Sequence, residues 1–201
     1  MAVNSPLFYF VRHGETDWNA ERRLQGQLDI PLNDVGRRQS AQCGSTLYGL
    51  IAARRKSPAD FAFISSPLSR ARETMEILRG ALGLAREGYT IEPRLAEMSF
   101  GRWEGLTYLE VRALDGLALA VRERDKWNFT APEGESYAQL LVRVREWHAG
   151  LEGNIVVAAH GGVARALMVL FGVRTPEDAP HGDVQQGVVY EFCSGVMKLH
   201  A

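Results

Sequence analysis

The chain has 201 residues, a formal net charge of −1, 46 % hydrophobic residues and 23 % charged residues. These values are typical of one globular domain and exclude disordered, collagen-like and disulfide-scaffold proteins. They also indicate no basic footprint for nucleic acid or an anionic membrane, and no apolar run is long enough to span a bilayer. Residues 1–6 lack basic side chains and the apolar core of a signal peptide, so we expect a cytoplasmic protein.

Cysteine use agrees with that location. Cys43 and Cys193 are the only cysteines, and neither belongs to a CxxC pair, which excludes zinc ribbons and thioredoxin chemistry. We expect both thiols to be reduced and buried as small core side chains.

Six short runs of apolar, β-branched or aromatic residues predict strands. They cover residues 7–11, 61–64, 89–91, 154–159, 188–192 and 196–199. We expect a turn at Ser194 and Gly195 between the last two.

Helices are predicted between these strands, at residues 34–53, 67–82, 106–127, 137–149 and 163–171. Asn33, Ser66 and Ser136 are the predicted N-caps, and Pro67 is a predicted first helical residue. Gly116 is the predicted interruption of the helix at 106–127, because glycine weakens a helix interior. The alternation is typical of a mostly parallel sheet covered by helices on both faces, in one α/β domain over residues 1–201. Residues 97–135 contain no convincing strand, and we expect them to cap the carboxyl edge of the sheet.

Charged side chains follow three of the strands. Arg12 and His13 come after the first strand, Arg70 follows the second, and His160 and Gly161 follow the strand at 154–159. Ligands of open α/β sheets bind at the carboxyl ends of strands, and two arginines with two histidines there suit a dianion such as phosphate. A glycine lets the backbone approach a ligand and supplies a free amide. The chain has no GxxxxGK[ST] or GxGxxG motif, which argues against nucleoside triphosphate and dinucleotide sites.

Phosphoryl chemistry at this edge needs a nucleophile and an acid. A neutral imidazole can attack phosphorus, and a carboxylic acid can protonate the departing oxygen. Glu97 is the candidate acid, with Glu92 and Glu104 as nearby rivals.

Five ordered motifs between residues 7 and 162 resemble the histidine phosphatase superfamily, which includes phosphoglycerate mutase. The first has the sequence RHGET and is followed by Trp18 and Asn19. The others lie at residues 23–36 (with RLQG and DIPL), 66–74 (SPLSRARET), 95–105 (LAE to WEG) and 156–162 (ending in HGG).

This resemblance implies a role for each matching residue. His13 becomes transiently phosphorylated, Arg12, Arg70 and His160 form the phosphate pocket with it, and Glu97 is the proton donor. The implied substrate contacts also include Asn19, Gln25, Gly26 and Gly161. The family uses no metal or cofactor, and its fold is a three-layer α/β/α sandwich with a mixed, mostly parallel sheet.

Two departures from the family pattern bear on function. Mutases of the family usually have asparagine two positions after the second histidine, where this chain has Gly162, as the phosphatase branch does. Glu133 replaces a glycine in a segment that resembles Pro-Gly-Gly-Glu-Ser. The sequence therefore predicts a metal-independent phosphomonoester hydrolase that acts through phosphohistidine on a small phosphorylated metabolite. A phosphoglycerate mutase is the alternative, and a non-catalytic phospho-ligand binding module is a third hypothesis, disfavoured by the presence of both His13 and Glu97.

Overall fold

One six-stranded sheet forms the centre of the computed structural model, which describes residues 6–193 and 195–201. The strand order is β3-β2-β4-β1-β5-β6. The strands are β1 (Phe8–Arg12), β2 (Phe61–Ser65), β3 (Thr90–Ile91), β4 (Asn154–Ala159), β5 (Val189–Cys193) and β6 (Val196–His200). The first four run parallel and β5 is antiparallel to β1, so the predicted mixed, mostly parallel sheet is confirmed. Residues 1–5 and the predicted turn residue Ser194 lie outside the described part of the chain.

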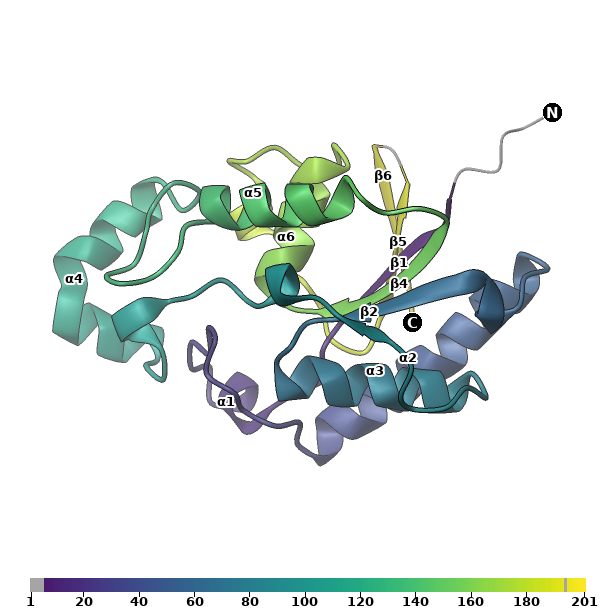
Figure 1. The fold of residues 1–201 in the computed structure, drawn as a ribbon. Coiled ribbons are helices and arrows are strands. Elements are labelled where there is room, and N and C mark those ends of the chain that lie inside the picture. The colour runs from purple at the N-terminus through teal and green to yellow at the C-terminus, as the bar shows by residue number, and fades with distance from the viewer. Residues whose placement is uncertain (1–5, 194) are drawn as a thin grey trace.

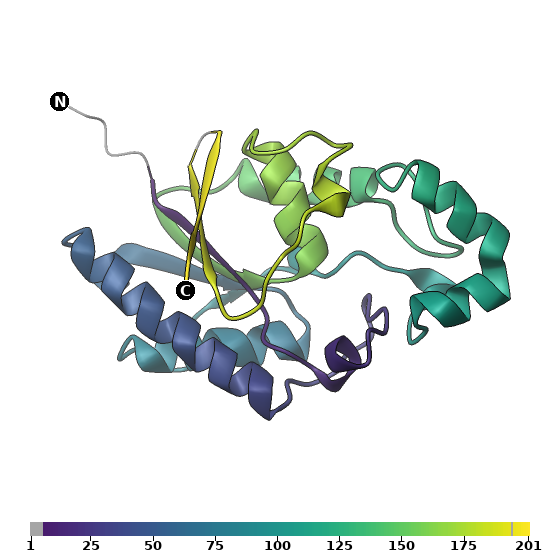
Figure 2. The same cartoon turned by 180° about the vertical axis from the view of Figure 1, so that it is seen from behind.

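Helices cover both faces of the sheet, which gives three layers (Figures 1 and 2). On one face lie α2 (Asp34–Ala53) and α3 (Ser69–Ala81), and on the other lie α5 (Tyr137–His148) and α6 (Gly161–Leu170). Beyond the sheet lie α1 (Asp17–Ala20) and α4 (Tyr108–Arg124); the 3₁₀ turns are η1 (Pro58–Asp60), η2 (Pro93–Leu95), η3 (Gly101–Trp103) and η4 (Ala179–His181). None of the helices in the described residues is long and apolar enough to cross a membrane.

Strand β1 shows how the sheet divides the core. Its side chains alternate between the two faces because successive residues of a strand point in opposite directions. Phe8 and Phe10 join the core under α5 and α6, whereas Tyr9 and Val11 join the core over α2 and α3. All four are buried, which is why the run is apolar throughout and not alternating.

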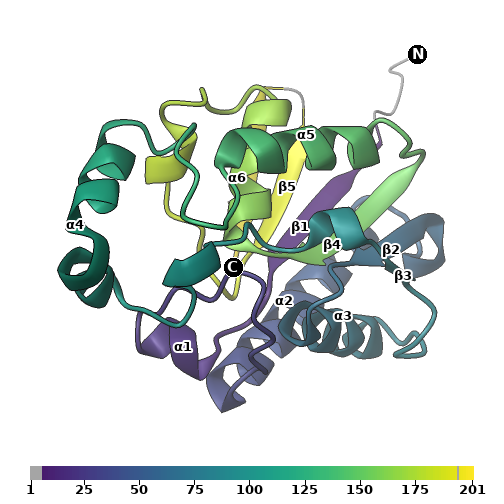
Figure 3. The ribbon, with the colours of Figure 1, turned by 60° about the vertical axis from the view of Figure 1, so that its left-hand side comes forward.

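The segment 97–135 leaves the sheet and carries α4 to one side of it (Figure 1). Asp115 has non-helical dihedral angles, so α4 is kinked directly before Gly116, the predicted interruption. A separate apolar cluster lies under α4 and includes Leu24, Trp103 and Val111. Figure 3 shows α4, α1 and α6 grouped around the carboxyl ends of β1 and β4.

Three sequence predictions, on Ser66, Pro67 and Cys193, are wrong. Ser66 and Pro67 do not begin the next helix: α3 begins at Ser69, and its N-cap Leu68 makes no side-chain capping bond. The Ser66 hydroxyl lies 2.6 Å from His160 Nε2 and accepts from Leu68 N at 3.3 Å, outside the helix. Cys193 is exposed, because it is the last residue of β5 at the turn into the edge strand β6, whereas Cys43 is buried in α2 as expected. Neither cysteine is in a disulfide.

Glu133 has a backbone conformation that favours glycine. Its φ is 62°, in the left-handed region that favours glycine. Its exposed carboxylate lies 3.0 Å from Arg102 Nε. The backbone of the segment therefore keeps the glycine-like turn despite the substitution.

The loop after β1 packs against the start of α2 with no room for a side chain. A Cβ on Gly14 would lie 2.2 Å from the carbonyl oxygen of Gly36. The amide of Gly14 also donates to Thr74 Oγ1 at 3.2 Å, which ties this loop to α3. The position of the residue before it, His13, thus depends on backbone-to-backbone packing.

We predict that Gly14→Ala lowers the free energy of unfolding by about 1–3 kcal/mol, because the new methyl group overpacks a rigid backbone contact. Gly49→Ala is the matched control, since no atom lies within 4 Å of a Cβ there. That control removes a flexible glycine from the interior of α2 and should raise stability by about 0.5–1 kcal/mol. Urea unfolding of both variants measures the difference, and equal effects would contradict the packing account.

Candidate active site

The pairing of the central strands brings the two predicted histidines together. Arg12 ends β1 opposite Ala159, which ends β4, so His13 and His160 leave the sheet as neighbours. The amide of His13 continues the ladder by donating to Ala159 O at 2.9 Å. The two imidazole rings meet edge to face, with centroids 5.1 Å apart.

The hydrogen bonding of His13 determines which ring nitrogen is free. Its Nδ1 lies 2.7 Å from the carbonyl oxygen of Gly14. A carbonyl can only accept, so Nδ1 carries the proton and Nε2 keeps its lone pair. Burial, together with the positive charges of Arg70 and Arg12, holds the pKa of His13 well below its usual range. The ring is therefore neutral near pH 7, with Nε2 available as a nucleophile.

The second histidine, His160, lies beside the His13 ring. Its Nε2 is 2.6 Å from Ser66 Oγ, and its buried Nδ1 has no hydrogen-bond partner. Burial and the charge of Arg70 also keep the pKa of His160 well below its usual range. Because an unpaired buried nitrogen is costly, Nδ1 marks a place where a ligand oxygen would be bound.

Three arginines are anchored to backbone carbonyls in the same way. Arg12 donates from Nη1 to Val184 O at 2.6 Å, and Arg70 donates to Leu28 O and Gly26 O, both at 2.8 Å. In both side chains the buried Nε has no partner. Fixed guanidinium groups with free donors are suited to a phosphate.

The third arginine, Arg165, was missed in the sequence. It donates from Nη2 to Gly182 O at 2.9 Å, and its Nε is also buried without a partner. Its signal in the sequence is that α6 is otherwise apolar and small, with Arg165 as its one charged residue.

Glu97 reaches the same site from the segment that follows η2. Its two carboxylate oxygens each lie 3.1 Å from the amide of Gly162, and Oε1 also accepts from Met98 N at 2.8 Å. A Cβ on residue 162 would lie 2.2 Å from Glu97 Oε1. The glycine that distinguishes this chain from the mutase pattern is thus the residue that makes room for the carboxylate.

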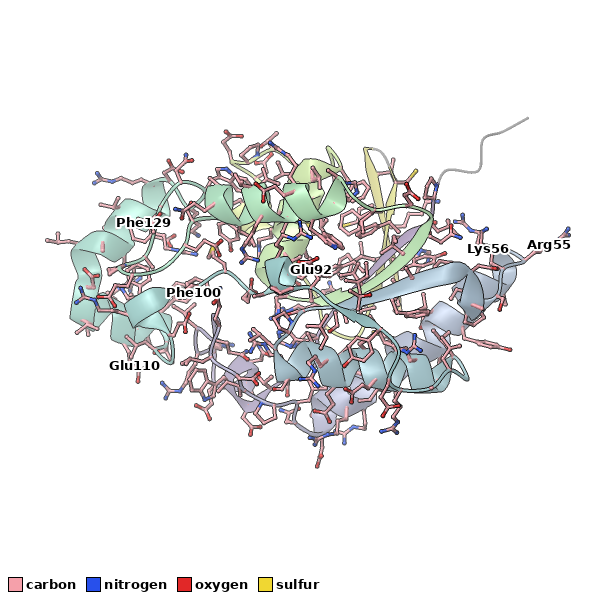
Figure 4. The ribbon with its side chains drawn as sticks, in the orientation of Figure 1. Arg55, Lys56, Glu92, Phe100, Glu110 and Phe129 are labelled. Atoms are coloured by element: carbon pink, nitrogen blue, oxygen red, sulfur yellow. The ribbon has the colours of Figure 1, made fainter. Side chains whose placement is uncertain are left out.

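The two rival carboxylates have other partners. Glu104 Oε1 accepts from Phe100 N at 3.0 Å and Gln27 N at 3.1 Å. Glu92 lies on the η2 turn (Figure 4), where it pairs with Arg94. Of the three predicted candidates, Glu97 is the one that lines the cavity.

The remaining predicted contacts also reach the cavity. Asn19 Oδ1 accepts from Thr16 N at 3.2 Å and Gln186 Nε2 at 3.1 Å, which fixes its side chain. Gln25 is buried with no partner for Oε1, while Gly26 has a φ of 51° and holds Arg70 through its carbonyl. Asn19, Gln25, Gly26 and Gly161 all line the cavity.

This cavity has a volume of about 540 Å³ and extends from His13 to α4. The sequence did not indicate which side chains of the segment 97–135 and its surroundings would line it. They are Phe100, Tyr108, Arg112, Leu119, Arg122, Glu123, Lys126 and, from α5, Tyr137. Those residues reach the cavity because α4 packs beside it, and the local sequence does not predict that tertiary position.

The low pKa values of His13 and His160 predict that stability falls in mild acid. Below about pH 6.5 the unfolded chain binds a proton at each histidine while the folded protein does not. The free energy of unfolding should then drop by up to about 1.4 kcal/mol per pH unit for each histidine. Urea unfolding from pH 7.5 to 5.0 in phosphate-free buffer measures this slope. His13→Asn should make it shallower, and an unchanged slope would contradict the assignment.

Comparison with known proteins identifies the family. A model of the histidine phosphatase superfamily (branch 1) matches residues 8–193. A glucosyl-3-phosphoglycerate phosphatase of Mycolicibacterium vanbaalenii is 36 % identical over 171 residues, 78 % of this chain and 70 % of the relative. A 2,3-bisphosphoglycerate-dependent phosphoglycerate mutase of Beijerinckia indica is 32 % identical over 191 residues, 90 % of this chain and 88 % of the relative.

Solved structures agree. That of a mycobacterial glucosyl-3-phosphoglycerate phosphatase has a TM-score of 0.76 and 28 % identity, covering 92 % of this chain and 89 % of that chain. The resemblance stated from the motifs is confirmed, and with it the three-layer fold of a phosphoryl-transfer enzyme. The chain belongs to the histidine phosphatase superfamily.

Proposed function

We propose that this protein is a phosphomonoester hydrolase in which His13 is phosphorylated and then dephosphorylated by water. The observation that carries the proposal is the state of His13: a buried, neutral imidazole whose Nδ1 is held by Gly14 O and whose Nε2 is free. Arg12 and Arg70 flank it with unpartnered Nε groups. A nucleophile beside an anion site supports attack on a phosphoryl group.

In the proposed reaction, His13 Nε2 forms a bond to phosphorus as the bond from phosphorus to the ester oxygen breaks. Arg12, Arg70 and His160 stabilise the charge on the equatorial oxygens. Glu97 gives its proton to the leaving oxygen, and the same carboxylate then accepts a proton from the water that attacks phosphohistidine. The water oxygen then bonds to phosphorus as the bond from phosphorus to His13 Nε2 breaks, which releases inorganic phosphate and restores the neutral imidazole.

Metal ions have no role in this proposal, because arginines supply the positive charge that phosphoryl transfer requires. We also propose a cytoplasmic location, which the unpaired cysteines Cys43 and Cys193 support. Asn19, Gln25, Gly26 and Gly161 are proposed as substrate contacts, and the segment 97–135 as the cap of the single domain.

The alternative reaction is a mutase reaction, in which a second hydroxyl takes the phosphoryl group from His13 before water does. The 32 % identity to the Beijerinckia indica mutase favours it. The pair Gly161 and Gly162 favours hydrolysis. Glu97 occupies the space that an asparagine side chain at position 162 would need.

A direct assay separates the two reactions. We predict that the protein releases inorganic phosphate from nitrophenyl phosphate and from members of a phosphomonoester panel, with or without 2,3-bisphosphoglycerate. Interconversion of 2- and 3-phosphoglycerate should be slow beside phosphate release. Fast interconversion with little phosphate would reject hydrolysis in favour of the mutase. His13→Ala is the control and should lose both activities.

The acid role of Glu97 predicts a dependence on the leaving group. Glu97→Gln should lower kcat for alkyl phosphates by about 10²–10⁴-fold, since an alkoxide needs a proton to depart. Nitrophenyl phosphate should lose far less, because nitrophenolate departs without one. Arg70→Ala should harm both esters alike, because Arg70 serves the phosphoryl group.

Two substitutions serve as controls for that series. Glu92→Gln removes a carboxylate on η2 that does not line the cavity, and Arg72→Ala removes an exposed arginine from α3. Both should retain activity with either ester. Equal losses for the alkyl and nitrophenyl esters in Glu97→Gln would place the acid elsewhere.

A further inference from the structure

Positive charge is concentrated in the cavity although the chain as a whole carries a formal charge of −1. The lining contains only two acidic side chains, Glu97 and Glu123. Its seven basic side chains are Arg12, Arg23, Arg70, Arg112, Arg122, Lys126 and Arg165. This excess is more than one phosphate dianion needs for neutralisation.

The basic side chains form two groups. Arg12, Arg70 and Arg165 line the cavity at its His13 end, and each has a buried Nε with no hydrogen-bond partner. Arg112, Arg122 and Lys126 come from α4 and the residues just after it. We call these three the α4 cations. They are separate in the fold from the strand-end loops that provide the first group (Figure 3).

The α4 cations are poorly neutralised by the protein itself. The Arg122 side chain is 7 % exposed and that of Lys126 is 19 % exposed, yet both share the single carboxylate of Glu123, at 3.3 and 3.0 Å. Arg112 makes no ion pair within the described residues. Largely buried charges without matching partners are costly, and such an arrangement is typical of a ligand site.

Arg23 shows the contrast. It lines the cavity too, but it pairs with Glu21 at 2.7 Å and with Glu110 at 2.9 Å. Glu110 lies at the near end of α4 (Figure 4). Arg23 therefore fastens α4 to the segment after α1, and its charge is more than balanced by two carboxylates, unlike the charges of Arg122 and Lys126.

Tyr137 connects the two ends of the cavity. It is buried, which raises the pKa of its phenol; the charges that act on it include Arg165 and Glu97 from one end and Arg122 from the other. Tyr137 also lines the cavity. One substrate could thus contact both groups of cations across this side chain.

We propose that the substrate carries a second anionic group, a carboxylate or a second phosphate, which binds the α4 cations while its phosphoryl group lies at His13. The proposal rests on the proposed phosphomonoesterase function and specifies its substrate class. Uncharged alcohol phosphates should be poor substrates, because they leave Arg122 and Lys126 without an anion.

Matched esters test the proposal. Glycerol 3-phosphate is the reference, 3-phosphoglycerate replaces its terminal hydroxymethyl group with a carboxylate, and glycerol 1,3-bisphosphate adds a second phosphate. We expect kcat/KM for at least one ester with a second anionic group to exceed the reference by about 10- to 100-fold, the value of one or two charge-assisted hydrogen bonds. Comparison of the two esters shows whether the site takes carboxylate or phosphate.

Substitutions then locate the binding group. Arg122→Gln and Lys126→Gln should each reduce this preference by about tenfold or more. Arg124→Gln is the control, because it makes the same change on α4 outside the cavity lining and should preserve the preference. Thermal melting verifies that each variant is folded, and Lys126→Gln provides the test if Arg122→Gln does not fold.

Titration calorimetry on the His13→Ala variant measures the affinity for each ester without any turnover. If the natural protein does not hydrolyse nitrophenyl phosphate, the proposed function is rejected. The dissociation constants of the matched esters would still show whether the second anion site exists. Equal affinity and equal kcat/KM for all three esters would overturn the inference. So would a preference that persists in both Arg122→Gln and Lys126→Gln.

Discussion

The parallel pairing of β1 with β4 is the constraint on which the rest of the site depends. It aligns Arg12 with Ala159, so the next residue of each strand, His13 and His160, leaves the sheet at the same edge. Pairing of β4 with β2 adds Ser66 beside His160. Because a shift of one residue would turn each side chain to the opposite face, the apolar cores on both faces also maintain the register of the site.

Burial then gives these residues their chemistry. Removal from water and the nearby arginines disfavour a positive charge on His13 and His160, so both imidazoles are neutral where the site is most cationic. The arginines remain in place because backbone carbonyls accept from their Nη groups. Backbone carbonyls thus hold the arginine side chains in place, and a bound anion would neutralise their charge.

Much of the fold and the phosphoryl end of the site could be predicted because they depend on local sequence. Helix α2 and strand β4 have the predicted bounds, and His13, Arg70 and His160 lie in linear motifs at strand ends. The N-cap at Ser66 was wrong because α3 begins three residues later, at Ser69, and Ser66 lies in the loop before it, beside His160. Glu97 could be separated from Glu92 and Glu104 only by its contact with Gly162, and Arg122 and Lys126 became visible only when α4 was placed over the cavity.

Trapping of the phosphoenzyme tests the central claim most directly. The protein is mixed with a ³²P-labelled phosphomonoester, quenched in alkali because phosphohistidine is labile in acid, and digested to locate the label. Since Nδ1 of His13 is bound to Gly14 O, the label should be on Nε2 of His13, stable in alkali, lost in acid and absent from His13→Ala. Label on a serine, or steady hydrolysis with no labelled histidine, would contradict the account.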